Sequence, residues 1–196
     1  GIFTLLAELV IAEGGVVFGA RFDKDWSVIH SWTDTVEGLA AFRGSKYVQS
    51  RIGDSYREAR EFLKQGRKVL FSGTPCQIAG LRKYLRKDYD HLLTVDFICH
   101  GVPSPGVWQR YLSELREELR AERSVGKNTV PLSMDELPVI TGISFRDKTN
   151  GWKKYGFLLR YAASEAASNS VSSSAIKEDK EFLQPFPENP FMRGFL

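Results

Sequence analysis

The stretch that decides the fold runs from Lys68 to Leu119 and begins KVLFSGTPCQIAGLRKYL. Its first five residues include β-branched and aromatic side chains, which is typical of a buried strand. The Gly-Thr-Pro that follows ends the strand and starts a helix, because Pro75 has no amide proton to leave unpaired and Thr74 can cap the first turn. Isoleucine and leucine then recur at helical spacing, so we predict a helix over Pro75–Leu85.

The same order of elements is repeated in the second half of this stretch. LLTVDFI, residues 92–98, predicts a second buried strand. Ser104 and Pro105 repeat the helix-start signal. An apolar stripe at helical spacing follows, formed by Trp108, Tyr111, Leu112, Leu115 and Leu119. Two strands joined by a helix run parallel with a right-handed crossover, so we expect their C-terminal ends at one edge of the sheet.

The two cysteines of the chain, Cys76 and Cys99, are 23 residues apart, and each lies just after one of these strands. Open α/β sheets bind ligands at this edge, so the two sulfurs can share one site if the strands are neighbours. Cys76 falls in the first turn of the predicted helix, where unpaired amides and the helix dipole favour a thiolate. A thiolate there is a nucleophile or a metal ligand. Two alternatives stay open: small buried apolar residues, which the spacing alone favours, and a disulfide, although nothing indicates an oxidising compartment.

The composition is that of an ordinary globular chain: 196 residues, 42% hydrophobic and 26% charged, enough for one hydrophobic core. The net charge of +3 is too small to indicate nucleic-acid binding. The longest apolar run, Phe3–Ala12, is shorter than the ~20 residues that a membrane-spanning helix needs, and no secretory signal is visible. We therefore expect a cytoplasmic protein with no nucleic-acid partner and no membrane span. Because the chain opens without Met and closes in an apolar run, we interpret it as a fragment of a longer protein.

Together these patterns predict the α/β class, with a mixed sheet that has a parallel strand-helix-strand-helix core and antiparallel hairpins. The expected hairpins pair residues 16–22 with 26–32 and residues 139–145 with 155–161. We expect residues 1–161 to form the core domain. Residues 162–196 are expected to hold a mobile Ser/Ala-rich segment and the start of a C-terminal region.

Three further helices are expected before the central stretch. The apolar face of the first is formed by Phe3, Leu6, Leu9 and Val10. The second spans Thr35–Phe42, and the third starts at a capping box formed by Ser55 and Glu58. Residues 120–137 have no steady period, so a surface excursion is predicted there.

Polar residues gather in two places that suit a ligand. The loop 43–51 is polar and irregular, and its Lys46, Tyr47 and Gln49 can contact a phosphate or a ring, although a solvated loop is the more common explanation. Gly73 and Thr74 leave backbone amides open at a helix start, which is a general phosphate-binding arrangement. Neither the P-loop motif nor the dinucleotide fingerprint occurs in the sequence.

Longer motifs carry a resemblance to a known family. They are FSGTPCQIAGLRKYL and LLTVDFICHGVPSPGVWQRYL within residues 71–112, GSKYVQS at 44–50, the opening Gly-x-Phe-Thr-Leu-Leu, FRDKTNGWKKYGF at 145–157 and NPFMRGFL at the end. With these motifs the chain resembles the beta-subunit family of coenzyme F420 hydrogenases and dehydrogenases. The last two motifs look like the bacterial branch of that family.

The resemblance implies a flavin and iron-sulfur oxidoreductase subunit, in which FAD passes electrons between four-iron clusters and a deazaflavin or another acceptor. Cys76 and Cys99 match cysteines expected to ligate a cluster, with further ligands from a Cys-x-x-Cys stretch beyond this chain. The positions expected to line the flavin are Gly44, Ser45, Lys46, Tyr47, Gly73 and Thr74. His100 is expected to hydrogen-bond a cluster sulfur or the flavin, or else to cap its own loop. The implied partner is a redox protein or a ferredoxin-like module that precedes Gly1.

Two functions of other classes stay open. In a thiol enzyme, Cys76 would act as the nucleophile with the help of His100. In a non-enzymatic interaction domain, the apolar C-terminal tail would dock a partner.

Overall fold

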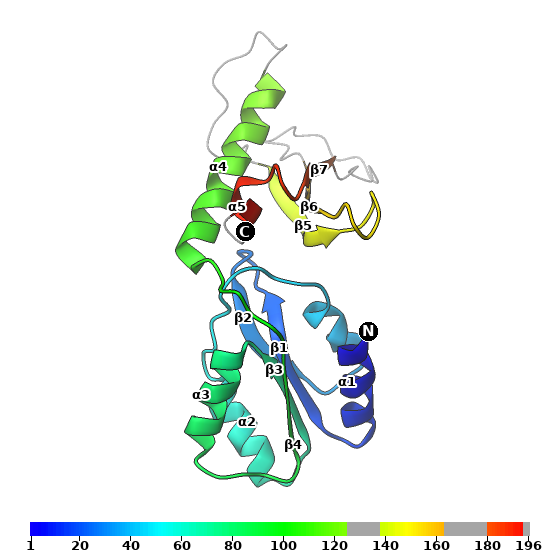
Figure 1. Cartoon of the computed structure of the whole chain (residues 1–196), viewed down its shortest axis with the longest axis vertical. Coiled ribbons are helices and arrows are strands. Elements are labelled where there is room, and N and C mark those ends of the chain that lie inside the picture. The colour runs from blue at the N-terminus through cyan, green and yellow to red at the C-terminus, as the bar shows by residue number, and fades with distance from the viewer. Residues whose placement is uncertain (125–137, 163–179, 194–196) are drawn as a thin grey trace, which may run out of the picture. The chain divides into compact units, whose positions relative to one another are not determined.

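The computed structural model describes residues 1–124, 138–162 and 180–193 (Figure 1). Its contacts divide the chain into two compact units, Gly1–Pro105 and Gly106–Leu196. The predicted domain boundary after Tyr161 lies within the second unit, and it stays a prediction. The predicted mobile segment lies almost wholly within residues 163–179, outside the described residues.

The first unit is built on a mixed four-stranded sheet, which confirms the predicted α/β class. Its strands are β1 (Val16–Phe22), β2 (Val28–Thr33), β3 (Val69–Gly73) and β4 (Leu92–Asp96), in the order β2-β1-β3-β4. β1 and β2 form the predicted antiparallel hairpin, while β1, β3 and β4 are parallel. The predicted parallel pair is confirmed, and its two strands are neighbours, which is the condition under which the two cysteine turns can share one site.

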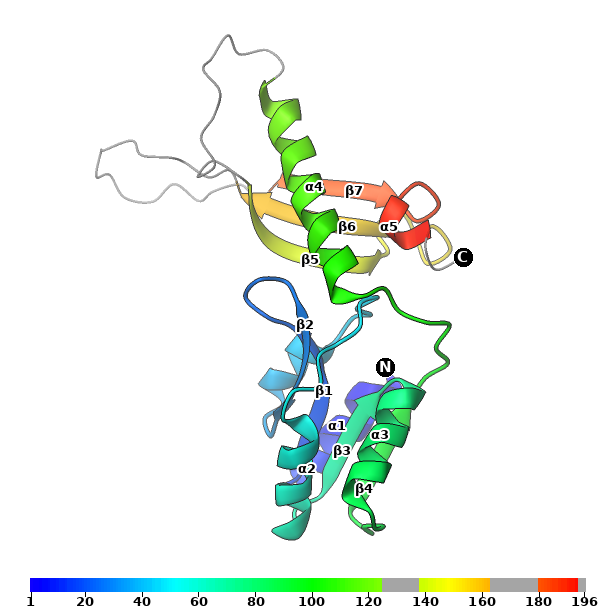
Figure 2. The ribbon, with the colours of Figure 1, turned by 90° about the vertical axis from the view of Figure 1, so that its left-hand side faces the viewer.

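Helices cover both faces of this sheet, as Figures 1 and 2 show. They are α1 (Ile2–Ala12), the 3-10 helix η1 (Glu37–Phe42), α2 (Ser55–Lys64) and α3 (Pro75–Leu85). Alternate residues of the central strands point to opposite faces. Phe71 of β3 packs into a buried cluster with α2 and α3, whereas its neighbour Leu70 packs into a second cluster with α1 and η1.

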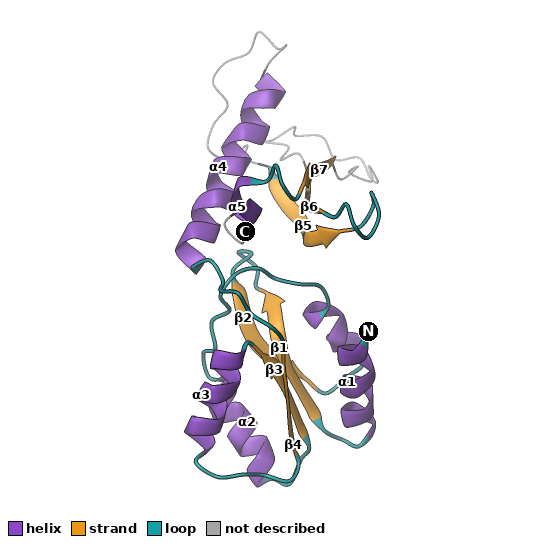
Figure 3. Ribbon diagram, viewed as in Figure 1, coloured by secondary structure: helices purple, strands orange, loops and turns teal. Residues whose placement is uncertain are grey.

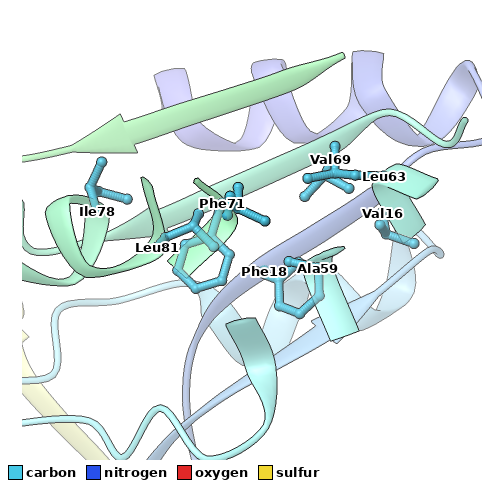
Figure 4. Close-up of a cluster of buried hydrophobic side chains, with 9 residues drawn as sticks. Val16, Phe18, Ala59, Leu63, Val69, Phe71, Ile78 and Leu81 are labelled. Atoms are coloured by element: carbon cyan, nitrogen blue, oxygen red, sulfur yellow. The ribbon is translucent and has the colours of Figure 1, made fainter. Parts of the chain in front are cut away.

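The cluster under α2 and α3 is the larger apolar core of this unit (Figure 4). The rings of Phe18 and Phe71 stack at 5.2 Å between centroids, and neither residue is exposed to solvent. Stacked, fully buried rings contribute both burial and ring–ring attraction, so they fix how β1 and β3 lie against the helices.

Three predicted details of this unit are wrong. The strand predicted over residues 92–98 is β4, and it ends at Asp96 rather than at Ile98. β4 pairs only with β3 and is partly exposed. Ile98 lies beyond its end and is 87% exposed instead of buried. In α1, Leu9 is 62% exposed, and the buried residues are Ala7 and Val10. Ser55 is the first residue of α2 and forms no cap, because the helix begins one residue earlier than a capping box at Ser55 requires.

The second unit contains α4 (from Pro105 to Ser124), β5 (Val139–Asp147), β6 (Gly156–Ala162), β7 (Lys180–Pro185) and α5 (Pro190–Arg193), coloured by type in Figure 3. The three strands form an antiparallel sheet in the order β5-β6-β7. The fully buried Trp108 packs against the rings of Phe145 and Phe191 at 5.0 Å. The β5–β6 hairpin and the apolar stripe of α4 were predicted. β7 was not predicted. Residues 120–124 belong to α4, whereas the sequence predicted a surface excursion there.

Among the described residues, no helix is long and apolar enough to cross a bilayer.

Candidate functional site

The two cysteine-bearing turns leave the sheet at the same edge. In the parallel pairing of β3 with β4, Gly73 lies opposite Asp96. Cys76 and Cys99 each follow their own member of this pair by three residues. Because parallel strands end on the same side, both turns start from adjacent points at the carboxyl edge of the sheet.

Neither cysteine is buried, so their interpretation as small core residues is wrong, and neither forms a disulfide. Cys76 is exposed at the second position of α3, and its Sγ lies 3.1 Å from Thr74 Oγ1. Cys99 is partly exposed, and its Sγ accepts a hydrogen bond from the backbone N–H of Gly101 at 3.4 Å. A helix N-terminus and an N–H donor both stabilise negative charge on sulfur.

The polar loop 44–50 is hydrogen-bonded to both cysteine turns. The backbone N–H of Gln49 donates to the carbonyl oxygen of Pro103, at 3.0 Å, beyond Cys99. The side chain of Ser50 accepts a hydrogen bond from Gln77 Nε2 at 2.9 Å, in the turn that carries Cys76. Three segments that are far apart in the sequence therefore meet at one edge.

A buried histidine holds this junction together. His30 in β2 is only 6% exposed, and its ring lies 5.4 Å from that of Phe71 in a stacked arrangement. Its Nε2 lies 2.9 Å from the carbonyl oxygen of Ser72, which can only accept a hydrogen bond, so Nε2 carries the proton. Nδ1 then accepts from the hydroxyl of Ser50 at 2.8 Å. The histidine is neutral in this arrangement, in agreement with burial, which lowers its pKa.

Gln77 connects this network to the start of α3. Its Oε1 accepts the N–H of Thr74 at 3.0 Å, which is one half of a capping box, and its backbone carbonyl accepts the hydroxyl of Tyr56 at 2.8 Å. A Cβ at Gly73 would lie only 3.0 Å from Gln77 Oε1. Glycine at this position thus permits the close approach of the Gln77 side chain to the end of β3.

Lys46 orders the loop from within. Its ammonium donates to the carbonyl oxygens of Ala41, Arg43 and Gly44 at 2.9, 3.0 and 3.3 Å, respectively. Burial lowers the pKa of Lys46 to about 8, so the group is still mostly charged at neutral pH. All three ammonium protons are engaged, and the side chain folds back on its own loop rather than reaching toward a ligand.

The other predicted site residues are accessible. Ser45 and His100 are exposed, and Tyr47 is partly buried. Gly44 and Gly101 have φ angles of +82° and +112°, and nothing lies within 4 Å of a Cβ built at either. The backbone of both loops is therefore open to a ligand at these points.

Sequence reasoning missed the residues that join the loops: His30, Ser50 and Gln77. The available signal was His30 itself, a polar residue at the inward position of an alternating strand. Its partners come from distant segments, so no spacing in the sequence could identify them.

Removing the Ser50 hydroxyl should loosen the attachment of the loop to the Cys76 turn. Ser50→Ala leaves His30 Nδ1 without its partner and leaves Gln77 Nε2 with only the Ser50 carbonyl oxygen at 3.4 Å. An unsatisfied buried polar group costs about 1–3 kcal/mol. We expect faster amide hydrogen exchange in residues 44–50, measured by mass spectrometry, with unchanged exchange in α1. Ser50→Thr retains the hydroxyl and is the matched control. Equal exchange in all three proteins would show that the network does not hold the loop.

The neutral His30 should make folding sensitive to acid. Because burial lowers its pKa below the usual 6.5, the unfolded chain takes up a proton at a higher pH than the folded chain does. The free energy of unfolding should therefore fall as the pH drops through about 6.5, and less steeply in His30→Gln. Urea unfolding between about pH 7.5 and 5.5 measures this, with His91→Gln as the control. A slope that His91→Gln reduces as much as His30→Gln would refute the assignment.

The stretch that carries both cysteine turns matches a known family. Residues 66–130 match the family model for the C terminus of the coenzyme F420 hydrogenase/dehydrogenase beta subunit. Among solved structures, the chain is similar to one in the xenon-derivatised F420-reducing nickel-iron hydrogenase complex from Methanosarcina barkeri, with 23% identity and a TM-score of 0.46. The similarity covers 70% of this chain and 49% of that one, so this chain spans about half of its length. No curated protein matches the chain.

The family match includes Gly73, Thr74, Cys76, Cys99 and His100. It confirms the recognition made from the motifs, whereas the assignment to the bacterial branch stays a prediction. On this match, residues 66–130 are similar to the C terminus of the beta subunit of coenzyme F420 hydrogenases and dehydrogenases.

Proposed function

We propose that this chain carries part of the cofactor site of an electron-transfer oxidoreductase subunit that uses FAD and an iron-sulfur cluster. The observation that supports this most is the junction of three loops. The Gln49–Pro103 and Ser50–Gln77 hydrogen bonds join the loop assigned to the flavin to both turns assigned to the cluster. An electron-transfer site requires two redox groups held close together on a rigid frame, and this junction supplies such a frame.

The described residues supply part of an iron-sulfur ligand set. Cys76 and Cys99 are the only cysteines of the chain, and a four-iron cluster takes four ligands. Within the described ranges, no group of three or more His, Cys, Asp or Glu side chains could hold a metal ion. The residues of this chain do not fit a complete cluster site, and the proposal takes the other ligands from outside these 196 residues.

The flavin would be held mainly by backbone. Gly44 and Gly101 offer open main chain on two of the three loops, and Thr74 lies at the N-terminus of α3, where the helix dipole favours a pyrophosphate. Lys46 keeps the first loop in shape by binding its carbonyl oxygens. Bound FAD supplies the exchange of electrons between carriers, and these residues position it.

The two rival functions have less support from the geometry. A thiol enzyme needs a base next to its nucleophile, but the side chain that is hydrogen-bonded to Cys76 Sγ is that of Thr74, and His100 makes no hydrogen bond to any described residue. The interaction domain was expected to use an apolar tail. Phe191 and Met192 of that tail are buried within the second unit, and residues 194–196 lie outside the described residues.

Several finer assignments remain part of the proposal. They are deazaflavin as an electron acceptor, a redox protein or ferredoxin-like module as a partner, and a cytoplasmic location.

The absorbance spectrum of the full-length protein, prepared without oxygen, tests the proposed function. We expect flavin bands near ~375 and ~450 nm and a broad iron-sulfur shoulder near ~410 nm. Cys76→Ser and Cys99→Ser should each reduce the shoulder and the iron content while the flavin bands remain. Both cysteines lie outside the cores, so the thermal stability of the variants is the control.

Two outcomes would contradict the proposal. A full-length protein with neither flavin bands nor iron would exclude it. Labelling of Cys76 by iodoacetamide, equally fast with and without iron-sulfur reconstitution, would instead favour a thiol enzyme, because a cluster ligand is shielded from the reagent.

A further inference from the structure

The turn between β5 and β6 is a concentrated basic and aromatic surface. We call it the basic turn and define it by Arg146, Lys148, Trp152, Lys153, Lys154 and Tyr155. Trp152 is 66% exposed, and the three lysines are exposed as well. Asp147 is the one acidic residue between Arg146 and Tyr155, so this short segment alone has a net charge of +3, equal to that of the whole chain.

The basic turn is an ordered structure. The N–H of Gly151 donates to the carbonyl oxygen of Lys148 at 2.8 Å, and that of Thr149 donates to Asp147 Oδ1 at 3.0 Å. The ring of Tyr155 packs on that of Phe186 at 5.1 Å. A surface that is already ordered loses little conformational entropy when a partner binds.

Within residues 1–124, 138–162 and 180–193, no acidic side chain pairs with the positive charges of the basic turn. Among the described residues, its four basic side chains form no ion pair, whereas Arg160, farther along the same hairpin, pairs with Glu181. Arg146 Nε is buried and has no hydrogen-bond partner among the described residues. Its guanidinium carbon lies 4.4 Å from the ring centre of Tyr155, and Lys148 Nζ lies 3.7 Å from that of Trp152. These cations keep their capacity to bind an external carboxylate.

We propose that the basic turn docks the acidic surface of a partner protein that carries electrons. Trp, Tyr and Arg are the residue types that dominate binding energy at protein interfaces, and here they lie together on one turn. The surrounding lysines would attract carboxylates and accelerate association. The inference that the partner carries electrons rests on the proposed function. The inference that its surface is acidic rests only on the charges of the basic turn.

Two other kinds of partner suit this surface less well. A nucleic acid is bound through a series of phosphates along a basic stripe or groove, and the basic turn is a single short segment. A membrane surface calls for several apolar side chains that insert together, and Trp152 is the one large apolar residue of the turn that is mostly exposed.

Binding of an acidic two-cluster ferredoxin to the full-length protein tests the proposal. The probe is immobilised, and dissociation constants are measured by interferometry at low and at physiological salt. Trp152→Ala and the double variant Lys153→Glu/Lys154→Glu should each weaken binding by about tenfold or more. Added salt should weaken binding of the unmodified protein as well. Trp152→Ala changes no charge, so it separates a specific contact from general attraction.

The matched control is Lys24→Glu/Lys83→Glu, two exposed lysines of the first unit, which changes the net charge by the same amount. It should weaken binding by less than about twofold. Equal weakening by both double variants, no measurable ferredoxin binding, or tighter binding of duplex DNA or phosphatidylserine vesicles would overturn the proposal. Because binding is read without electron transfer, a missing flavin would count against the proposed function and not against this surface.

Discussion

The parallel pairing of β3 with β4 is the constraint on which the candidate site depends. Its register sets Gly73 opposite Asp96, and each cysteine follows its own member of this pair by three residues in the sequence. A slip of one residue would turn every side chain of a strand to the opposite face, which the buried Leu70 and Phe71 on the two faces of β3 do not permit. The apolar cores thus determine where the cysteine turns begin.

Pairing alone does not make a site, because loops beyond a sheet edge are free to separate. The separation is prevented by a few buried polar contacts, centred on the hydroxyl of Ser50 between His30 and Gln77. In a low-dielectric environment such a network is stabilising only when each member is satisfied. That requirement connects β2, the polar loop and the first turn of α3. Backbone hydrogen bonds between Arg51, at the end of the loop, and Val28 and His30 in β2 reinforce one side of this connection.

The central elements were predictable because their signals are local. KVLFS followed by Gly-Thr-Pro predicted both β3 and the start of α3, and the end of α3 at Leu85 also agrees with the prediction.

Errors occurred where burial depends on tertiary neighbours. Phe97 and Ile98 have the residue types of a buried strand, but β4 is an edge strand and ends before them. Likewise, α1 is apolar nearly all round, so its sequence could not tell that Leu9 would be exposed. The network around Ser50 was beyond sequence reasoning because it joins residues from separate segments.

The central claim is that Cys76 and Cys99 face one shared rim, and a short bifunctional thiol reagent applied to the reduced chain tests it most directly. We expect one dominant product, in which a single reagent joins both cysteines within one molecule. Its mass and peptide map identify this product, and it should be absent from Cys99→Ala. Two independently modified cysteines in each molecule, with no internal cross-link at any reagent concentration, would contradict it.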